Sequence, residues 1–192
     1  ILSFLNSKIS IYLLGCISPT LNLLPGNLNS LPISFNRKDI DTSLTSDLIN
    51  ISKREFDLRE SSWDFEKNQL ISQNVQELED SFDLFKQYWT NKFFQIHKNE
   101  EELNRQFIEI YGLQDELTPE VPLEDITILK EETSIFNGKL VFDQEEVFSQ
   151  FISYAVGCMF GRYSLDKEGL VLANQGETLQ DYLLKVEKQE SE

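Results

Sequence analysis

Residues 75–98, VQELEDSFDLFKQYWTNKFFQIHK, carry the strongest periodic pattern in the chain and decide its class of fold. Large apolar side chains recur there at spacings of three and four residues: Val75, Leu78, Phe82, Phe85, Trp89, Phe93 and Ile96. Because a helix has about 3.6 residues per turn, these side chains fall on one stripe. The spacing predicts a helix about 36 Å long, at about 1.5 Å per residue. Such a stripe is typical of a core or a helix–helix contact and is seldom a surface for stacking bases.

Residues 99–112 predict more helix. Asn99 and Glu102 resemble a capping box, in which the first side chain accepts a bond from an exposed amide and the second reaches back. Apolar residues then recur at helical spacing as far as Tyr111, and Gly112 is suited to end a helix. The two stretches together predict either a helical hairpin or one long, kinked helix.

Three other segments also predict helices. Residues 39–59 and 144–163 have apolar side chains at helical spacing, and residues 1–14 form an apolar run that favours a helix over a buried strand, ending near Gly15. Gly157 and Gly161 are four residues apart in the second of these segments. Small residues at that spacing predict close packing of a neighbouring backbone.

The remaining segments predict loops and short strands. Residues 18–27 are rich in Pro, Gly and Asn and predict an ordered loop, and Leu31–Pro32–Ile33 predicts a short edge strand. Residues 113–138 predict short extended pieces, and residues 185–192 a frayed end. The predicted fold class is mainly α, a helical hairpin or bundle with long amphipathic helices, a loop-rich opening and a few short strands.

Charge is distributed unevenly along the 192 residues, whose formal net charge is −16. Residues 1–76 hold seven Lys/Arg against eight Asp/Glu, which leaves ten against twenty-five for residues 77–192, or −1 and −15. The first 38 residues contain no acid, only Lys8, Arg37 and Lys38. Phosphate binding requires a basic footprint, so any contact with nucleic acid is expected in this opening. The acidic remainder is expected to be a solvated surface or a face for a protein partner.

No catalytic motif is present in the sequence. It lacks a phosphate-binding G-x-x-x-x-G-K-[ST] loop, and the lone His97, predicted to lie at the surface, has no nucleophile motif beside it. One His with Cys16 and Cys158 far apart does not make a zinc site, so both thiols are expected to be free in the reducing cytoplasm. No run reaches the roughly 18 to 20 apolar residues of a membrane span, so no membrane partner is expected.

Met159 is the only methionine, and the chain opens on an apolar run, Ile1–Leu2–Ser3–Phe4–Leu5. We therefore expect the chain to be an internal piece of a longer cytosolic protein, without a complete active site of its own.

Several stretches resemble one protein family when they are read in order. Phe4–Lys8, Pro19–Asn22, Gly26–Asn27 and Leu31–Ile33 resemble the end of a target-recognition region in adenine-specific DNA methyltransferases, and Ser61–Phe65 and Asn99–Leu113 resemble the helical section that follows. The most specific stretch is ISYAVGCMFGRYSLD, residues 152–166. It is similar to the large methyltransferases of bacterial BREX phage-exclusion systems, the PglX family, which are related to restriction–modification enzymes.

The resemblance implies a parent enzyme that transfers a methyl group from S-adenosylmethionine to N6 of a flipped adenine in duplex DNA. Such enzymes use a glycine-containing cofactor loop and an Asn-Pro-Pro-aromatic motif, and this chain has no Pro-Pro pair. Both motifs are expected before Ile1, so no catalytic, cofactor-binding or metal-binding residue is assigned here. The resemblance divides the chain into the end of the target-recognition region (1–38), a helical linker or hairpin (39–112) and a C-terminal helical region (113–192).

The resemblance also implies a supporting role in DNA recognition. Phosphate contacts are expected from Lys8, Arg37 and Lys38 and also from Arg162, beside Gly161. Phosphate or base-edge contacts are expected from Asn6, Asn22 and Asn27, unless these asparagines stabilise their own turns. Two other functions remain open. The acidic helices form a module that binds another phage-defence protein, or the chain is a restriction nuclease domain, for which the sequence shows no persuasive metal-binding cluster.

Overall fold

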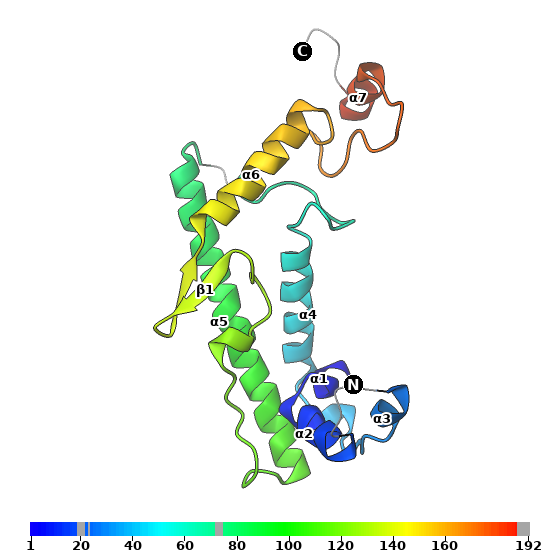
Figure 1. Cartoon of the computed structure of the whole chain (residues 1–192), viewed down its shortest axis with the longest axis vertical. Coiled ribbons are helices and arrows are strands. Elements are labelled where there is room, and N and C mark those ends of the chain that lie inside the picture. The colour runs from blue at the N-terminus through cyan, green and yellow to red at the C-terminus, as the bar shows by residue number, and fades with distance from the viewer. Residues whose placement is uncertain (19–21, 23, 72–74, 188–192) are drawn as a thin grey trace. The chain divides into compact units, whose positions relative to one another are not determined.

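Helices dominate the computed structural model, which describes residues 1–18, 22, 24–71 and 75–187 (Figure 1). Its elements in chain order are α1 (Leu2–Leu5), α2 (Lys8–Ile17), α3 (Pro25–Asn29), the short 3₁₀ helix η1 (Arg37–Asp39), α4 (Thr42–Phe56), α5 (Leu78–Tyr111), the 3₁₀ helix η2 (Leu123–Asp125), strands β1 (Thr133–Phe136) and β2 (Lys139–Phe142), α6 (Gln144–Met159) and α7 (Leu179–Val186). The prediction of a mainly α fold with short strands is confirmed.

The chain divides into two compact units, which are described separately. The first unit comprises residues Ile1–Ile51 and Lys92–Ile126, and the second comprises Ser52–Asn91 and Thr127–Glu192. Helices α4 and α5 contribute residues to both units, and β1, β2, α6 and α7 belong to the second.

Helix α5 contains the aromatic stripe and is one uninterrupted helix of 34 residues, about 50 Å at about 1.5 Å per residue. Five of the seven predicted stripe residues are buried, whereas Val75 and Leu78, before and at the first turn, are more than one third exposed. Asn99 lies inside the helix, so the predicted cap and the hairpin alternative are wrong. The end at Gly112 is confirmed, since this glycine has φ +66° and Leu113 N–H donates to the Ile108 carbonyl (3.1 Å).

The core of the first unit is built around Phe4 and Phe107. Both side chains are fully buried, and their ring centroids are 5.6 Å apart. Phe35 packs on both rings, at 5.3 and 5.2 Å, and Tyr111 stacks on Phe4. The Tyr111 hydroxyl donates to the Pro32 carbonyl (2.5 Å). The C-terminal turns of α5 therefore hold the chain's opening and residues 31–40 in one core, which also contains Ile9, Leu31, Ile40, Leu103 and Ile108.

The second unit contains the two-stranded antiparallel sheet. Ser134 pairs with Val141 and Phe136 with Lys139, and the turn between the strands is Asn137–Gly138, both with positive φ. An Asn-Gly turn of this kind matches the right-handed twist of a hairpin. One face of the hairpin packs on α5, where the ring centroids of Phe142 and Phe85 are 6.0 Å apart.

Several predicted local structures differ from those observed. Gly15 lies inside α2, and residues 25–29 form α3, with Pro25 at its first turn as proline prefers. Leu31–Ile33 is not a strand: Leu31 is buried in the first core, whereas Ile33 is 55% exposed. Helix α7 was not predicted. Residues 19–21 and 23 of the predicted loop, and 188–192 of the predicted frayed end, lie outside the described residues.

Gly157 confirms the predicted close packing in α6. A Cβ atom there would lie 2.6 Å from Cδ2 of Tyr163, whose ring is fully buried between Phe65 and Tyr154. Gly161 follows the helix with φ +75°, and a Cβ there would lie 3.0 Å from Leu172. The nearest atoms at both glycines are therefore side-chain atoms of the same unit, including those of Tyr182 in α7, and not the neighbouring backbone that was predicted.

Gly157→Ala is expected to lower the free energy of unfolding by about 1–3 kcal/mol, the usual cost of overpacking a core. The Tyr163 ring has little room to yield, since its hydroxyl also donates to Glu60 (3.1 Å). Urea denaturation followed by circular dichroism measures the change. Gly15→Ala is the matched control, because this glycine lies in α2 with nothing within 4 Å of a Cβ. That variant is expected to gain roughly 0.5–1 kcal/mol, and an equal loss in both variants would contradict the packing argument.

Candidate functional site

Lys8, the first basic residue of the acid-free opening, is anchored within the first unit. It begins α2, which is capped by Ser7, and its backbone N–H donates to Asn104 Oδ1 (3.0 Å). Its ammonium group donates to the backbone carbonyl of Glu120. A phosphate contact by Lys8 would therefore compete with an internal hydrogen bond.

The other predicted contacts of the first unit lie at its surface or near it. Lys38 is exposed on η1, and Asn6 and Asn22 are exposed. Asn27 is half-buried in α3, where its N–H donates to the Leu24 carbonyl (2.9 Å). The side chain of Arg37 lies outside the described part of the structure. The structure thus places Lys8, Lys38 and the three asparagines in one unit.

Arg162 belongs to the second unit and is also exposed. Its guanidinium carbon lies 5.4 Å from the centroid of the Tyr163 ring, a cation–π distance. Its backbone joins two segments, because its N–H donates to Gly157 (2.8 Å) and its carbonyl accepts from Val171 (2.8 Å).

A buried charged network in the second unit was missed by the sequence analysis. Glu132 is 4% exposed, and its carboxylate accepts from Arg59 (3.1 and 3.2 Å) and from Gln150 (2.8 Å). Arg59 also pairs with Glu55 (2.7 Å) and Glu131 (2.6 Å). Only the Glu55–Arg59 spacing of four residues was a signal in the sequence.

The same network fixes an unusual backbone conformation at Leu129. This residue has φ +56°, which side chains other than glycine rarely adopt. Its N–H donates to Glu55 Oε1 (3.2 Å), and its carbonyl accepts from the Thr133 hydroxyl (2.8 Å). The side chain is 1% exposed. These bonds and the burial of Leu129 hold a strained turn just before the hairpin.

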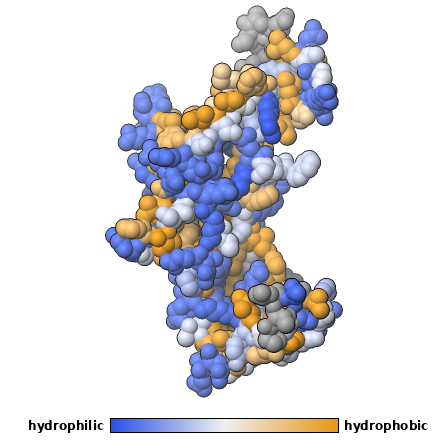
Figure 2. Space-filling view, viewed as in Figure 1, coloured by the Kyte–Doolittle hydropathy of each residue, from blue (hydrophilic) through white to orange (hydrophobic). Residues whose placement is uncertain are grey.

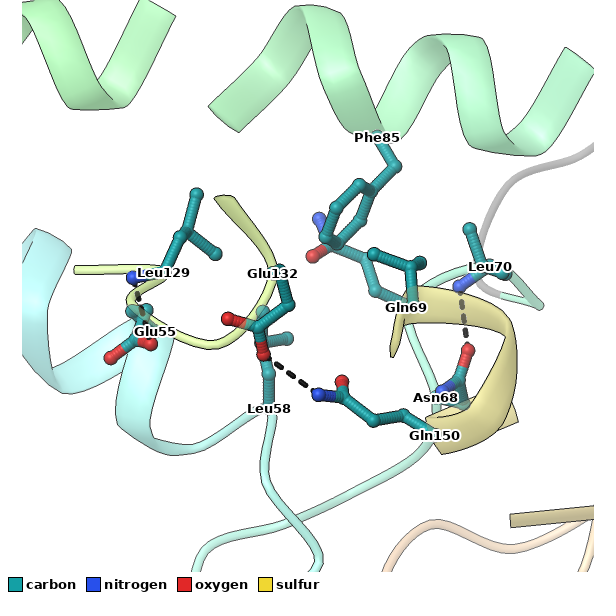
Figure 3. A pocket seen from close by; sticks show the side chains of 10 residues that line it. Glu55, Leu58, Asn68, Gln69, Leu70, Phe85, Leu129, Glu132 and Gln150 are labelled. Atoms are coloured by element: carbon teal, nitrogen blue, oxygen red, sulfur yellow. Dashed lines mark hydrogen bonds between the residues drawn. The ribbon is translucent and has the colours of Figure 1, made fainter. Parts of the chain in front are cut away.

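Figure 3 shows the residues that line a small cavity beside this network, with Gln150 hydrogen-bonded to Glu132 and Phe85 extending toward them from α5. Its volume of about 20 Å³ has room for about one water molecule. Across the described residues, no group of three or more His, Cys, Asp or Glu side chains is arranged to hold a metal ion. The cavity can therefore hydrate the buried polar groups, and it is too small for a nucleotide or for S-adenosylmethionine.

His97 is a packing residue of the first unit rather than the predicted surface histidine. Its side chain is 21% exposed, and Nε2 lies 2.7 Å from the Val121 carbonyl oxygen. One turn further along α5, Glu101 accepts from the Val121 N–H (3.1 Å), and Asn104 donates to Pro119 (3.3 Å). Residues 119–121 are thus tied to α5 by side chains three and four residues apart.

Glu100, on the same stretch of α5, is a half-buried carboxyl group. Burial raises the pKa of Glu100, His97 opposes this shift and Asp125 adds to it. A raised folded-state pKa favours the protonated form, so the stability linked to Glu100 is present at acidic pH and is lost as pH rises through that pKa.

Glu100→Gln is therefore expected to raise the melting temperature at pH 7 and to change it little at pH 4. Thermal unfolding of the variant and the parent at the two pH values checks this result. Glu109→Gln, at an exposed position of the same helix, is the control and is expected to show no such pH-dependent difference. A pH-independent effect of Glu100→Gln would contradict burial as the cause.

No helix among the described residues is both long and apolar enough to cross a membrane, and no family model matches the chain. Two relatives do match. The chain is 37% identical over 178 residues to the adenine-specific methyltransferase PglX of Lacticaseibacillus casei (strain Zhang), covering 90% of this chain and 14% of that protein. It is 35% identical over 182 residues to the adenine-specific methyltransferase BrxX of Escherichia coli O9:H4 (strain HS), covering 92% and 15%. The chain spans about a seventh of the length of these relatives. It is homologous to one segment of the adenine-specific methyltransferases PglX and BrxX.

Proposed function

We propose that this chain is a non-catalytic segment of an S-adenosylmethionine-dependent adenine-N6 DNA methyltransferase of a bacterial phage-defence system. Residues 1–38 end its target-recognition region, residues 39–112 form a helical linker, and residues 113–192 form a helical region beyond it. The observation that carries the proposal is the match over nine tenths of the chain to two relatives that are both named adenine-specific methyltransferases.

In this proposal, duplex DNA is the partner of the parent enzyme and the first unit supports its recognition. The acid-free opening supports this role, because residues 1–38 contribute Lys8, Arg37 and Lys38 and no carboxylate that would repel a phosphate backbone. S-adenosylmethionine binds elsewhere in the parent protein, which acts in the cytoplasm, where the DNA is.

Salt-dependent binding of the chain to duplex DNA tests the recognition role. Binding is expected to weaken steeply with salt, and Lys8→Ala/Arg37→Ala/Lys38→Ala is expected to flatten the slope of log K against log salt by about 0.9 per lost phosphate contact. The charge-matched control is Lys86→Ala/Lys139→Ala/Lys167→Ala, in the second unit, with circular dichroism as a check on folding of both variants. An absence of binding at low salt would overturn the recognition role.

A methylation assay tests the non-catalytic role separately. The purified chain, given labelled S-adenosylmethionine and duplex DNA, is expected to transfer no methyl group. Transfer by this chain alone would show that it contains an active site.

A second function is a module that binds another protein of the same defence system. The net charge of −15 on residues 77–192 favours it, since such a surface attracts a basic partner. A pull-down with the other proteins of the system separates the two functions, because a purely DNA-supporting segment is expected to retain none of them.

A further inference from the structure

Beyond its first turn, where Glu145 is exposed, the exposed side of α6 carries no charged side chain. Its large apolar residues are Ile152, Val156 and Met159, which are 60%, 43% and 83% exposed, and they are followed by Phe160, the residue after the helix, which is 80% exposed. Their spacing of four, three and one residues places them on one side of the helix. Ser149 and Ser153 are the exposed polar residues among them. We call these six residues the uncharged α6 face.

This face differs from the rest of the chain's surface. Residues 147–161 contain no Asp, Glu, Lys or Arg, although 26% of the chain is charged. The opposite side of α6 already packs in the second unit through Val147 and Tyr154, which are 3% and 1% exposed. A surface helix normally has charged residues opposite its buried stripe, so α6 has the pattern of a helix that is covered on both sides.

Exposed apolar residues continue beyond the end of the helix. Leu165 is 70% exposed and Leu170 is 51% exposed, and the bond from Val171 N–H to the Arg162 carbonyl holds this segment beside the helix end. Figure 2 shows apolar residues gathered over α6. Phe, Met and Arg are enriched where protein surfaces meet, and Phe160, Met159 and Arg162 lie together here.

We propose that the uncharged α6 face docks against the remainder of the methyltransferase polypeptide, through an apolar surface on that part. This inference rests on the proposed function, and the relatives indicate the occupant, because 85–86% of their length lies outside the matched segment. A second copy of the chain is a poorer occupant, since each copy carries a net charge of −16 and the two would repel. Contacts within one polypeptide avoid that repulsion.

Met159 allows a direct test, because it is the only methionine in the chain. Its oxidation by hydrogen peroxide is measured by peptide mass spectrometry in the isolated chain and in the full-length methyltransferase that carries it, each relative to its rate in denaturant. Met159 is expected to oxidise close to the denatured rate in the isolated chain and at least several-fold more slowly in the full-length protein. Equal, fast oxidation in both would overturn the proposal.

Two variants show whether the protection comes from this face. Phe160→Lys, next to the methionine, is expected to restore rapid Met159 oxidation in the full-length protein, because it places a charge in the apolar contact. Gln144→Lys adds the same charge at the exposed start of α6 and is expected to leave the protection intact. Protection in the isolated chain that disappears on dilution would show that a second copy covers the face and would overturn the proposed occupant.

The readout depends on neither DNA nor cofactor. If Met159 is protected from oxidation in a full-length protein that does not methylate DNA, the proposed function is wrong and the proposed interface stands. If the full-length protein methylates DNA but Met159 is not protected, only the proposed interface is wrong.

Discussion

Trp89→Ala is expected to lower the free energy of unfolding by about 3–5 kcal/mol, the usual cost of truncating a buried aromatic residue. Trp89 is fully buried, lies 5.1 Å from the Tyr88 ring, and donates its indole N–H to Gln69 (2.7 Å). The variant loses the packing and leaves the Gln69 oxygen, in a side chain that is only 9% exposed, without this donor. Because domains are stable by only about 5–15 kcal/mol, this change removes a large share of the stability.

Urea denaturation followed by circular dichroism measures this effect, and the chain supplies its own control. Trp63 is the other tryptophan and is fully exposed, so Trp63→Ala is expected to change stability by no more than about 0.5 kcal/mol. Trp89→Phe separates the two contributions, because it keeps an aromatic ring and removes the indole donor. A small loss of unfolding free energy for Trp89→Ala would show that the aromatic stripe contributes little to the stability of the core.

A comparison of the predicted and the observed aromatic stripe shows how much of the fold could be predicted from sequence. The apolar spacing of the stripe depends only on helix geometry, so the helix and its buried side were predicted correctly. The break at Asn99 was wrong, because capping chemistry is local and the buried residues on both sides decide whether a helix continues. Ile96 and Leu103 are 2% and 4% exposed, so both turns pack and the helix runs through. Asn99 is itself buried there, at 7%.

The candidate site was less predictable, for two physical reasons. The contact between Arg59 and Glu132 joins residues 73 positions apart, and no periodicity reports such a pair. The basic residues of the opening were chosen by charge alone, and charge does not reveal an internal acceptor such as the Glu120 carbonyl near Lys8. The assignment of these residues to DNA contact remains a prediction, which the salt titration tests.

Arg59→Ala is expected to lower the free energy of unfolding by about 3 kcal/mol. Removing one partner leaves the buried carboxylate of Glu132 uncompensated, which costs about 3–5 kcal/mol. We expect a value at the lower end of this range, because the Arg59 side chain is 22% exposed. The loss also frees Glu55, whose carboxylate holds the strained backbone of Leu129. Proteolytic cleavage of the residues between α4 and the β1–β2 hairpin is therefore expected to become faster as the free energy of unfolding falls.

A second substitution distinguishes a buried charge from a lost surface contact. Arg59→Ala/Glu132→Gln is expected to recover part of the stability, because a neutral amide at this position needs no counter-charge and its oxygen still accepts from Gln150. Lys53→Ala is the control. Its ammonium pairs with Asp57 and Asp64, but the side chain is 58% exposed, so a much smaller loss than that of Arg59→Ala is expected. If Lys53→Ala costs as much as Arg59→Ala, or if Glu132→Gln rescues nothing, burial of the Glu132 charge is not what makes Arg59 necessary.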